Sequence, residues 1–171
     1  MAPAARCGQV SLRLLRRLRR RNKGTITWGR LASSRVRDGS PPFRLRMTSR
    51  VDTLVEASRE HLQRVSPHDL AGEVAAGAVV VDIRPIENRQ AEGEMPGAVV
   101  IDRNVLEWRL DPTSDHRLPF ASDEARVILF CNDGYASSLA AATLQKLGVP
   151  RATDLDGGYR AWRRLGATGL P

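Results

Sequence analysis

The segment Arg126-Val-Ile-Leu-Phe-Cys-Asn-Asp-Gly-Tyr-Ala-Ser137 decides the fold, because a strand, a loop and a helix follow one another along it. Residues 126–130 are rich in β-branched and aromatic types and lead directly into Cys131, which is typical of a buried strand. Asn132-Asp-Gly134 has the composition of a turn. Residues 137–147 are rich in Ala and Leu and predict a helix, which Gly148 and Pro150 end.

The chain on either side repeats this alternation in short units. Apolar runs predict further strands over residues 78–83, 98–101 and 152–155, and helical patterns cover residues 52–64, 66–77, 85–92, 104–110 and 159–165. We place Ser66 at the N-cap of the second of these helices and Pro67 at its first helical position. Strands that are apolar on both faces and alternate with helices indicate an α/β domain with a mainly parallel central sheet flanked by helices.

Charge divides the chain into two parts. The formal net charge is +8, yet residues 1–46 contain 13 Lys and Arg and a single acid, Asp38. Residues 47–171 therefore carry a net charge of −4 and have the size of one domain. A basic protein often binds nucleic acid, but here the whole excess of positive charge lies in the first 46 residues.

Three interpretations of residues 1–46 stay open. An Arg-rich, acid-poor start is typical of an organelle targeting peptide. It is also typical of a basic arm that binds nucleic acid or an anionic membrane. The third interpretation, which we favour, is that the protein starts at Met47 and that residues 1–46 are upstream sequence. We expect residues 1–46 to be a disordered extension, and the protein to be cytoplasmic unless they are a targeting peptide.

Composition excludes several classes of protein. No apolar run approaches the roughly 20 residues that a membrane span needs. Cys7 and Cys131 are too few for a disulfide scaffold or a Cys-rich zinc site. His68 and His116 have no ligand partner at metal spacing, so we predict no metal.

Cys131 is the candidate nucleophile. It ends a buried strand, and ligands of open α/β sheets bind at the carboxyl ends of strands. Gly134 permits a positive φ, so the loop can curl with its N–H groups inward, and the next helix presents its N-terminus to the same point. Such surroundings favour a thiolate that attacks an electrophilic sulfur or a phosphoryl group. The alternative is an inert buried cysteine, but the turn directly after Cys131 favours a functional one.

The loop Cys131-x-x-Gly-x-x-Ser137 resembles the active-site loop of rhodanese domains. Three further motifs, in the same order along the chain, are similar to those of that family: Asp82-x-Arg84 with Glu87 after it, Gly93-Glu-Met-Pro-Gly97-Ala, and Asp156-Gly157-Gly158-Tyr159 to Trp162. The resemblance covers about residues 66–166 of a domain spanning residues 47–171, and residues 101–112 are similar to single-domain rhodaneses of high-GC actinobacteria. It implies a rhodanese-like three-layer fold.

The resemblance also implies a sulfurtransferase without a cofactor. Cys131 would take a sulfane sulfur from thiosulfate or a persulfide, hold it as a covalent persulfide and pass it to cyanide, a thiol or an acceptor protein. No second cysteine follows residue 46, so the acceptor thiol must come from another molecule. Besides Cys131, the implied donor-binding residues are Asn132, Asp133, Gly134, Tyr135, Ala136, Ser137, Arg103 and Arg109, and the implied structural residues are Asp82, Arg84, Gly97, Gly157, Gly158 and Trp162.

Two loop positions depart from the patterns of related domains. Many rhodaneses carry Arg where Ala136 stands, and that Arg helps to bind dianionic thiosulfate. Its absence argues against efficient thiosulfate turnover unless Arg103, Arg109 or Arg117 supplies the charge. Phosphatases of this fold need Arg six residues after the cysteine for bidentate phosphate binding, and Ser137 occupies that position.

Two functions of different classes remain. One is the sulfurtransferase, and the other is a non-catalytic binding module of the same fold that carries or senses persulfide for a partner protein. Retention of Cys131 favours the enzyme. We expect Asp82 and Arg84 to form a structural ion pair and Trp108 to pack internally. We predict no membrane partner, and a nucleic-acid partner only if residues 1–46 act as a basic arm.

Overall fold

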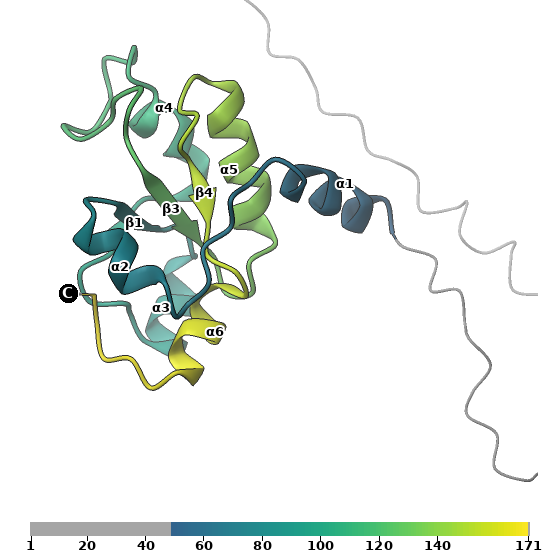
Figure 1. Cartoon of the computed structure of the whole chain (residues 1–171), viewed down its shortest axis with the longest axis vertical. Coiled ribbons are helices and arrows are strands. Elements are labelled where there is room, and N and C mark those ends of the chain that lie inside the picture. The colour runs from purple at the N-terminus through teal and green to yellow at the C-terminus, as the bar shows by residue number, and fades with distance from the viewer. Residues whose placement is uncertain (1–48, 171) are drawn as a thin grey trace, which may run out of the picture. The chain divides into compact units, whose positions relative to one another are not determined.

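The computed structural model describes residues 49–170, and these form an α/β domain around one parallel sheet (Figure 1). The four strands lie in the order β2-β1-β3-β4. Their bounds are Val79–Asp82 for β1, Val99–Val100 for β2, Val127–Phe130 for β3 and Thr153–Asp154 for β4. Leu129 of β3 pairs with Val81 on one side and with Asp154 on the other. The predicted parallel sheet is confirmed, whereas our expectations for residues 1–46 lie outside the described residues.

Helices connect the strands and precede the first of them. Their bounds are Arg50–Arg59 for α1, Leu70–Ala75 for α2, Ile86–Glu92 for α3, Leu106–Leu110 for α4, Ala136–Lys146 for α5 and Gly158–Arg164 for α6, with a 3-10 turn η2 over Arg103–Val105. No helix among residues 49–170 is long and apolar enough to cross a membrane.

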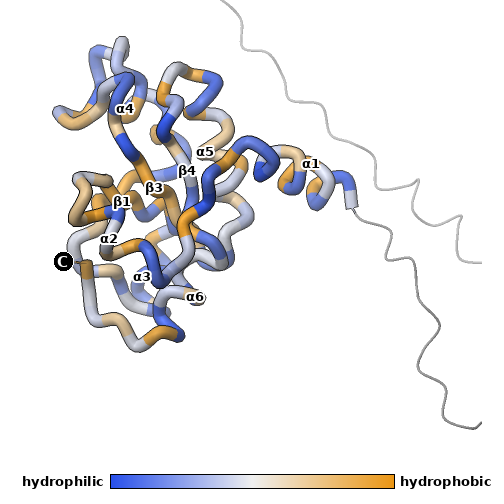
Figure 2. Tube along the Cα trace, viewed as in Figure 1, coloured by the Kyte–Doolittle hydropathy of each residue, from blue (hydrophilic) through white to orange (hydrophobic). Residues whose placement is uncertain are grey.

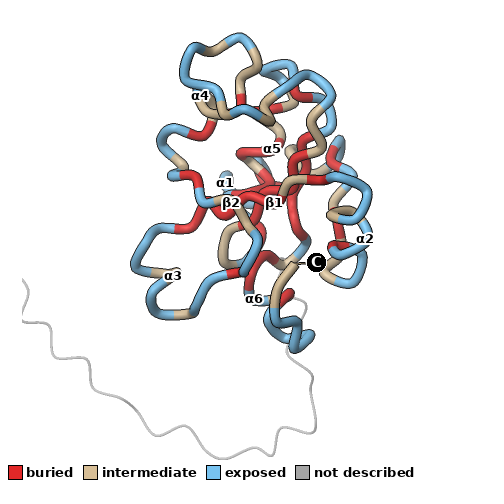
Figure 3. The backbone as a smooth tube through the Cα atoms, turned by 90° about the vertical axis from the view of Figure 1, so that its left-hand side faces the viewer, coloured by how far each residue is buried: buried red, intermediate tan, exposed pale blue. Residues whose placement is uncertain are grey.

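The sheet separates two apolar clusters, and this gives the domain three layers. Val81 and Leu129 point to the side covered by α4 and α5, where Leu106 and Leu144 are fully buried. The intervening strand residues point to the opposite side, which α2 and α6 cover with Leu70, Tyr159 and Trp162. The central strand β3 is accordingly hydrophobic along its length and buried, as is most of β1 (Figures 2 and 3). The three-layer fold is as expected.

The connections create a switch point at the carboxyl end of the sheet. The chain passes from β1 outward to β2, then crosses to β3 on the other side of β1 and continues to β4. The loops after β1 and β3 therefore leave in opposite directions. A crevice forms where such loops diverge and is the usual ligand site of open α/β sheets. Cys131 directly follows β3 at this point.

The first helix is shorter than its pattern predicts. We expected a helix over residues 52–64, but α1 ends at Arg59 and leaves Leu54 57% exposed. Leu62 and Val65 are buried after the helix rather than on it. The reason is a backbone pairing: Val65 donates its N–H to the Asp154 carbonyl at 3.0 Å and forms a parallel bridge with Leu155. The segment thus extends the sheet edge beside β4.

Two other local predictions were wrong. Ser66 and Pro67 lie in a turn before α2, which begins at Leu70 with Asp69 as its N-cap. The Ser66 hydroxyl donates to the Asp69 carboxylate at 2.7 Å and accepts from the Asp69 N–H at 3.3 Å, so it closes this turn rather than the first turn of α2. Trp108 is 58% exposed rather than internal. The short helix α4 buries Leu106 and its i+4 neighbour Leu110, and the residue midway between them faces the opposite side.

Candidate active site

The loop between β3 and α5 curls around the sulfur of Cys131. Gly134 has φ +79°, and its N–H donates to Cys131 Sγ at 3.2 Å. A Cβ at Gly134 would lie 3.1 Å from the Gly157 nitrogen and 3.2 Å from the Leu155 carbonyl oxygen. Glycine is therefore required here both by its backbone conformation and by the close approach of the next loop.

The N-terminus of α5 adds to the polarity around this sulfur. The helix has 11 residues and begins at Ala136, directly after the loop. Its N-cap residue Tyr135 makes no side-chain cap. The first-turn N–H groups of a helix lack intrahelical acceptors and carry the positive end of the helix dipole. The half-buried Cys131 thus lies where an anion on sulfur is stabilised.

A fully buried carboxylate lies behind the loop. Asp154 of β4 accepts from Ser138 Oγ at 2.7 Å and from Ser137 Oγ at 3.4 Å, and Ser137 Oγ is in turn 3.5 Å from Cys131 Sγ. Arg64 binds the same carboxylate through two nitrogens, at 2.9 and 3.2 Å. Burial opposes the charge of Arg64, but the hydrogen bonds and charges of Asp154 and Asp156 raise its pKa above the ordinary value.

Helix α1 reaches the outer side of the loop. Arg59, its last residue, donates through Nη2 to the Gly134 carbonyl at 2.7 Å and through Nε to Ser138 Oγ at 3.1 Å. Its guanidinium carbon lies 5.3 Å from the centre of the exposed Tyr135 ring. The second half of the loop is therefore held by a helix that precedes the sheet in sequence.

The Gly157-Gly158 turn holds the start of the loop. The N–H groups of Tyr159 and Arg160 donate to the carbonyls of Cys131 and Asn132, at 2.8 and 3.1 Å. A Cβ at Gly158, which has φ +61°, would lie only 2.4 Å from the Cys131 carbonyl oxygen. The turn thus fixes the backbone of Cys131.

Side chains of α3 and α6 bind the polar loop residues. Asn132 accepts from Asn88 Nδ2 and donates to Glu92, each at 2.8 Å. Arg160 bridges Glu92 at 2.6 Å and Asp133 at 2.8 Å. The hydrogen bond from Arg160 lowers the pKa of Glu92 despite its partial desolvation, so this carboxylate stays an acceptor. Asn132 and Asp133 therefore point toward α3 and α6.

The remaining motif residues support the surrounding structure. Asp82 and Arg84 form a buried ion pair at 2.7 Å, and the Arg84 guanidinium stacks on Tyr159 with its carbon 3.7 Å from the ring centre. Gly97 has φ +90° against Leu170, and Trp162 is buried in the cluster under α6. These contacts place the motif residues in the framework around the loop.

The two arginines predicted to bind the donor lie on the connection between β2 and β3, Arg103 in η2 and Arg109 in the last turn of α4. Arg103 Nη1 binds the Glu107 carboxylate at 2.8 Å, and Arg109 Nη1 donates to the His116 carbonyl at 2.9 Å. Arg117 donates to the Ser114 carbonyl within its own loop. Each of these guanidiniums has a partner on its own connection, and their role in donor binding stays a prediction. Ala136 brings no charge to the loop.

Sequence reasoning missed several residues that hold the loop. Five of them lie far from the loop in sequence: Arg59, Arg64, Glu92, Asp154 and Arg160. A single Arg or Asp at the end of an element resembles any other surface charge in a sequence. Only the pairing of residue 65 with β4, which the pattern did not reveal, brings the first two to the loop.

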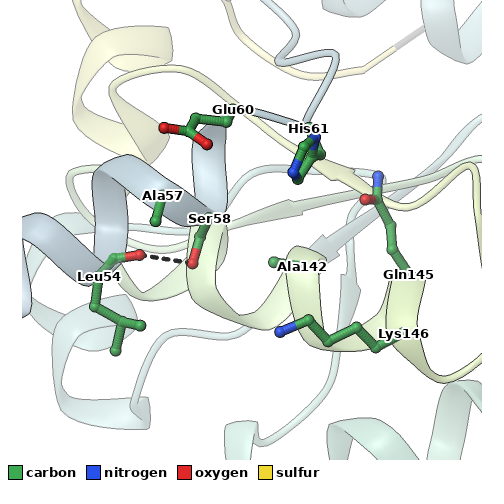
Figure 4. A pocket seen from close by; sticks show the side chains of 8 residues that line it. All are labelled: Leu54, Ala57, Ser58, Glu60, His61, Ala142, Gln145 and Lys146. Atoms are coloured by element: carbon green, nitrogen blue, oxygen red, sulfur yellow. Dashed lines mark hydrogen bonds between the residues drawn. The ribbon is translucent and has the colours of Figure 1, made fainter.

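A separate groove lies between α1 and the distal part of α5. It has a volume of about 530 Å³ and is lined by Leu54, Ala57, Ser58, Glu60, His61, Ala142, Gln145 and Lys146 (Figure 4). None of these residues belongs to the loop from Cys131 to Ser137. The groove and the loop are therefore formed by different residues.

Comparison with protein families agrees with this geometry. The rhodanese-like domain model matches residues 66–165. Thiosulfate sulfurtransferase GlpE of Pseudomonas fluorescens is 33% identical over 102 residues, which cover 59% of this chain and 84% of that protein. The GlpE protein of Pseudomonas entomophila is 33% identical over 101 residues, with the same coverage of both chains.

Solved structures show the same fold. A Rhodopseudomonas palustris protein of unknown function, described as a possible tyrosine phosphatase, superposes with a TM-score of 0.63 at 27% identity and covers 71% of this chain and 94% of its own. The polysulfide-sulfur transferase homodimer of Wolinella succinogenes has a TM-score of 0.50 at 23% identity, over 70% of this chain and 83% of its own. The second likeness concerns the fold alone.

Proposed function

The chain belongs to the rhodanese-like domain family, and from this premise we propose that it is a sulfurtransferase that carries a sulfane sulfur as a persulfide on Cys131. One observation carries the proposal: the Gly134 N–H donates to Cys131 Sγ at the N-terminus of α5. Hydrogen-bond donors aimed at a reacting atom stabilise the charge that develops there. The similarity to thiosulfate sulfurtransferases supports the same class of reaction.

The reaction has two half-steps, and both are displacements at sulfur. The Cys131 thiolate attacks the outer sulfur of a donor such as thiosulfate, the donor S–S bond breaks, and sulfite leaves with the electron pair. An acceptor thiolate or cyanide then attacks the outer sulfur of the persulfide. That S–S bond breaks in turn, and the electron pair returns to Cys131. No cofactor takes part in this scheme.

The donor remains open between thiosulfate and a persulfide. Ala136 leaves the loop without a cation for a dianionic donor, and Arg103 and Arg109 are our candidates to supply it. Each already binds a partner on its own connection, so recruiting either one requires that contact to be exchanged. We therefore expect slower turnover with thiosulfate than with a persulfide donor, whose reacting sulfur group carries a single charge.

A phosphatase reading is disfavoured, although one solved relative is described as a possible tyrosine phosphatase. Phosphate ester hydrolysis on such a loop depends on an Arg that grips two phosphate oxygens at once. Ser137 stands at that position, six residues after Cys131, and is directed at Asp154 and Cys131. A hydroxyl group next to a carboxylate cannot bind a phosphate dianion in place of a guanidinium.

The test is the intact mass of the purified full chain before and after incubation with thiosulfate, in parallel with Cys131→Ser. We expect a gain of one sulfur atom that cyanide reverses and that the variant lacks. Cys7 serves as an internal control, because peptide mapping separates it from Cys131.

Glutathione persulfide replaces thiosulfate if the first donor gives no gain. Failure of both donors at Cys131, with a folded protein, would contradict the enzyme and favour the binding module. A gain that persists in Cys131→Ser would contradict the assignment of the nucleophile.

A further inference from the structure

Two serine hydroxyls behind the loop each face a choice of acceptor. Ser138 Oγ lies 2.8 Å from the Gly134 carbonyl oxygen and 2.7 Å from Asp154 Oδ2. Ser137 Oγ lies 3.5 Å from Cys131 Sγ and 3.4 Å from Asp154 Oδ2. A hydroxyl has a single hydrogen, so each serine donates to one of its two neighbours at a time. Which one it selects depends on what else binds those neighbours.

Arg59 determines the choice of Ser138. Its Nη2 already donates to the Gly134 carbonyl at 2.7 Å, and its Nε donates to Ser138 Oγ itself at 3.1 Å. The carbonyl is thus satisfied without the serine, and the serine oxygen is used as an acceptor by a cation. Its hydrogen is then directed to the Asp154 carboxylate, where the hydrogen bond is charge-assisted and short.

The occupied carboxylate in turn determines the choice of Ser137. Asp154 Oδ2 receives the Ser138 hydroxyl at 2.7 Å and Arg64 Nη2 at 3.2 Å, while its Oδ1 receives Arg64 Nε. Ser137 at 3.4 Å is the most distant of these donors. An anionic sulfur on the other side of Ser137 is a better acceptor than a carboxylate oxygen with two donors already in place.

We propose that Arg59 is a positioning residue that, through Ser138 and Asp154, directs the Ser137 hydroxyl to donate to the sulfur of Cys131. The contacts of Arg59 at the loop are with the Gly134 carbonyl, Ser138 Oγ and the Tyr135 ring rather than with the sulfur. It acts by occupying the Gly134 carbonyl and thereby orienting a chain of hydroxyls. It lies before residues 66–165, which match the family model, so the matched domain alone does not include it. Its part in sulfur transfer rests on the proposed function.

The test compares Arg59→Ala with Arg50→Ala, an exposed arginine in the first turn of the same helix. For the full chain, the readouts are the rate of Cys131 alkylation by iodoacetamide, resolved from Cys7 by peptide mapping, and kcat and KM with thiosulfate or glutathione persulfide. In Arg59→Ala we expect alkylation and kcat to fall about tenfold with KM unchanged, because a misaligned donor costs transition-state stabilisation without weakening donor binding. Arg50→Ala should match the wild type.

A double-mutant cycle with Ser137→Ala separates positioning from general structural support. If Arg59 acts through Ser137, the double variant should be no slower than Ser137→Ala alone, whereas independent effects would multiply. Multiplying effects, a raised KM with unchanged kcat, or an Arg59→Ala variant as reactive as Arg50→Ala would each overturn the proposal.

A loss of fold is checked by circular dichroism, and Arg59→Lys supplies a second variant. Lys keeps the charge but has a single nitrogen, so it binds one of the two acceptors, and its rates should lie between those of the wild type and Arg59→Ala. Rates for Arg59→Lys equal to those of the wild type would overturn the proposal. If the wild type transfers no sulfur, the proposed function fails, yet the alkylation series still decides the role of Arg59.

Discussion

At Gly158, one added methyl group should disturb the backbone of Cys131. A Cβ there would lie 2.4 Å from the Cys131 carbonyl oxygen and 2.8 Å from the Asn132 carbonyl oxygen, and the residue has φ +61°. We expect Gly158→Ala to lower the free energy of unfolding by about 2–4 kcal/mol, combining backbone strain with the clash. Urea unfolding measures the loss, and the alkylation rate of Cys131 reports whether the loop has shifted.

Gly166→Ala is the matched control for the backbone contribution. Gly166 has φ +71°, but nothing lies within 4 Å of a Cβ placed on it. Its substitution should cost only the left-handed conformation, about 1–2 kcal/mol, and should leave Cys131 reactivity unchanged. Equal losses of unfolding free energy in Gly158→Ala and Gly166→Ala would contradict the conclusion that close packing of the Gly157-Gly158 turn fixes the backbone of Cys131.

Arg84 belongs to the structural framework, and its removal should be costly. The side chains of Arg84 and Asp82 are both almost fully buried and joined at 2.7 Å. Arg84→Met leaves the Asp82 carboxylate buried without its cation, so we expect a loss of about 3–5 kcal/mol in unfolding free energy. Arg103→Met breaks the partly exposed pair with Glu107 and should cost less than about 0.5 kcal/mol. Similar losses of unfolding free energy for Arg84→Met and Arg103→Met in chemical denaturation would refute this ranking.

Among the elements, α2 is tied to the start of β3 by Glu73 and Arg126, whose charged atoms lie 2.9 Å apart. The hydrogen bond from Arg126 lowers the pKa of Glu73 from 4.5, although burial opposes the shift. A carboxyl with a depressed folded pKa stabilises the fold above its unfolded pKa, and this stabilisation disappears as the pH falls through the folded value.

Wild-type chain and Glu73→Gln should therefore differ at neutral pH and converge in acid. Because both side chains are partly exposed, we expect a difference of about 0.5–1 kcal/mol at neutral pH. Urea denaturation at a series of pH values measures it, with exposed Glu124→Gln as the control. A Glu73→Gln difference that stays constant as the pH falls below 4.5 would refute the ion-pair assignment.

Strands and motif loops were predictable because their signals are local. The apolar run before Cys131 and the glycines at positions 134, 157 and 158 each express a conformation that the sequence must satisfy within a few residues. The end of α1 was not, because it depends on pairing across the fold: α1 stops at Arg59, shortly before Val65 pairs beside β4. The same pairing brings Arg59 and Arg64 into contact with residues that lie 75 to 90 positions later in the sequence. Hydrophobic periodicity does not reveal such distant partners.

On the scale of the whole described domain, the loop that follows Cys131 is held from several directions at once. α1 and β4 bind its second half, through Arg59 and Asp154. α3 and α6 bind its first half, through Glu92 and the amides after Gly158. A loop fixed by four elements needs little reorganisation when charge develops on its sulfur, which is the condition for electrostatic preorganisation.

The folded domain extends further toward the N-terminus than the part that matches the family. The family match begins at residue 66, yet Val55, Leu62 and Val65 are buried, and Arg64 binds the buried Asp154. Burying an aliphatic side chain contributes about 1.5–3 kcal/mol, and a whole domain is stable by only about 5–15 kcal/mol. Residues 55–65 therefore supply a large share of the stability.

A chain that begins at Ser66 should consequently unfold at much lower urea concentration than the full chain, or fail to fold. It also leaves Asp154 buried without Arg64, which adds the cost of an uncompensated charge. A chain that begins at Met47 is the matched control, because it removes the basic segment and keeps every buried contact of the described residues. Circular dichroism during urea titration compares the three. Equal urea midpoints for the chains starting at Met47 and Ser66 would show that residues 49–65 contribute little to the stability of the domain. A lower midpoint for the chain starting at Ser66, but not for the chain starting at Met47, would make these residues part of the core.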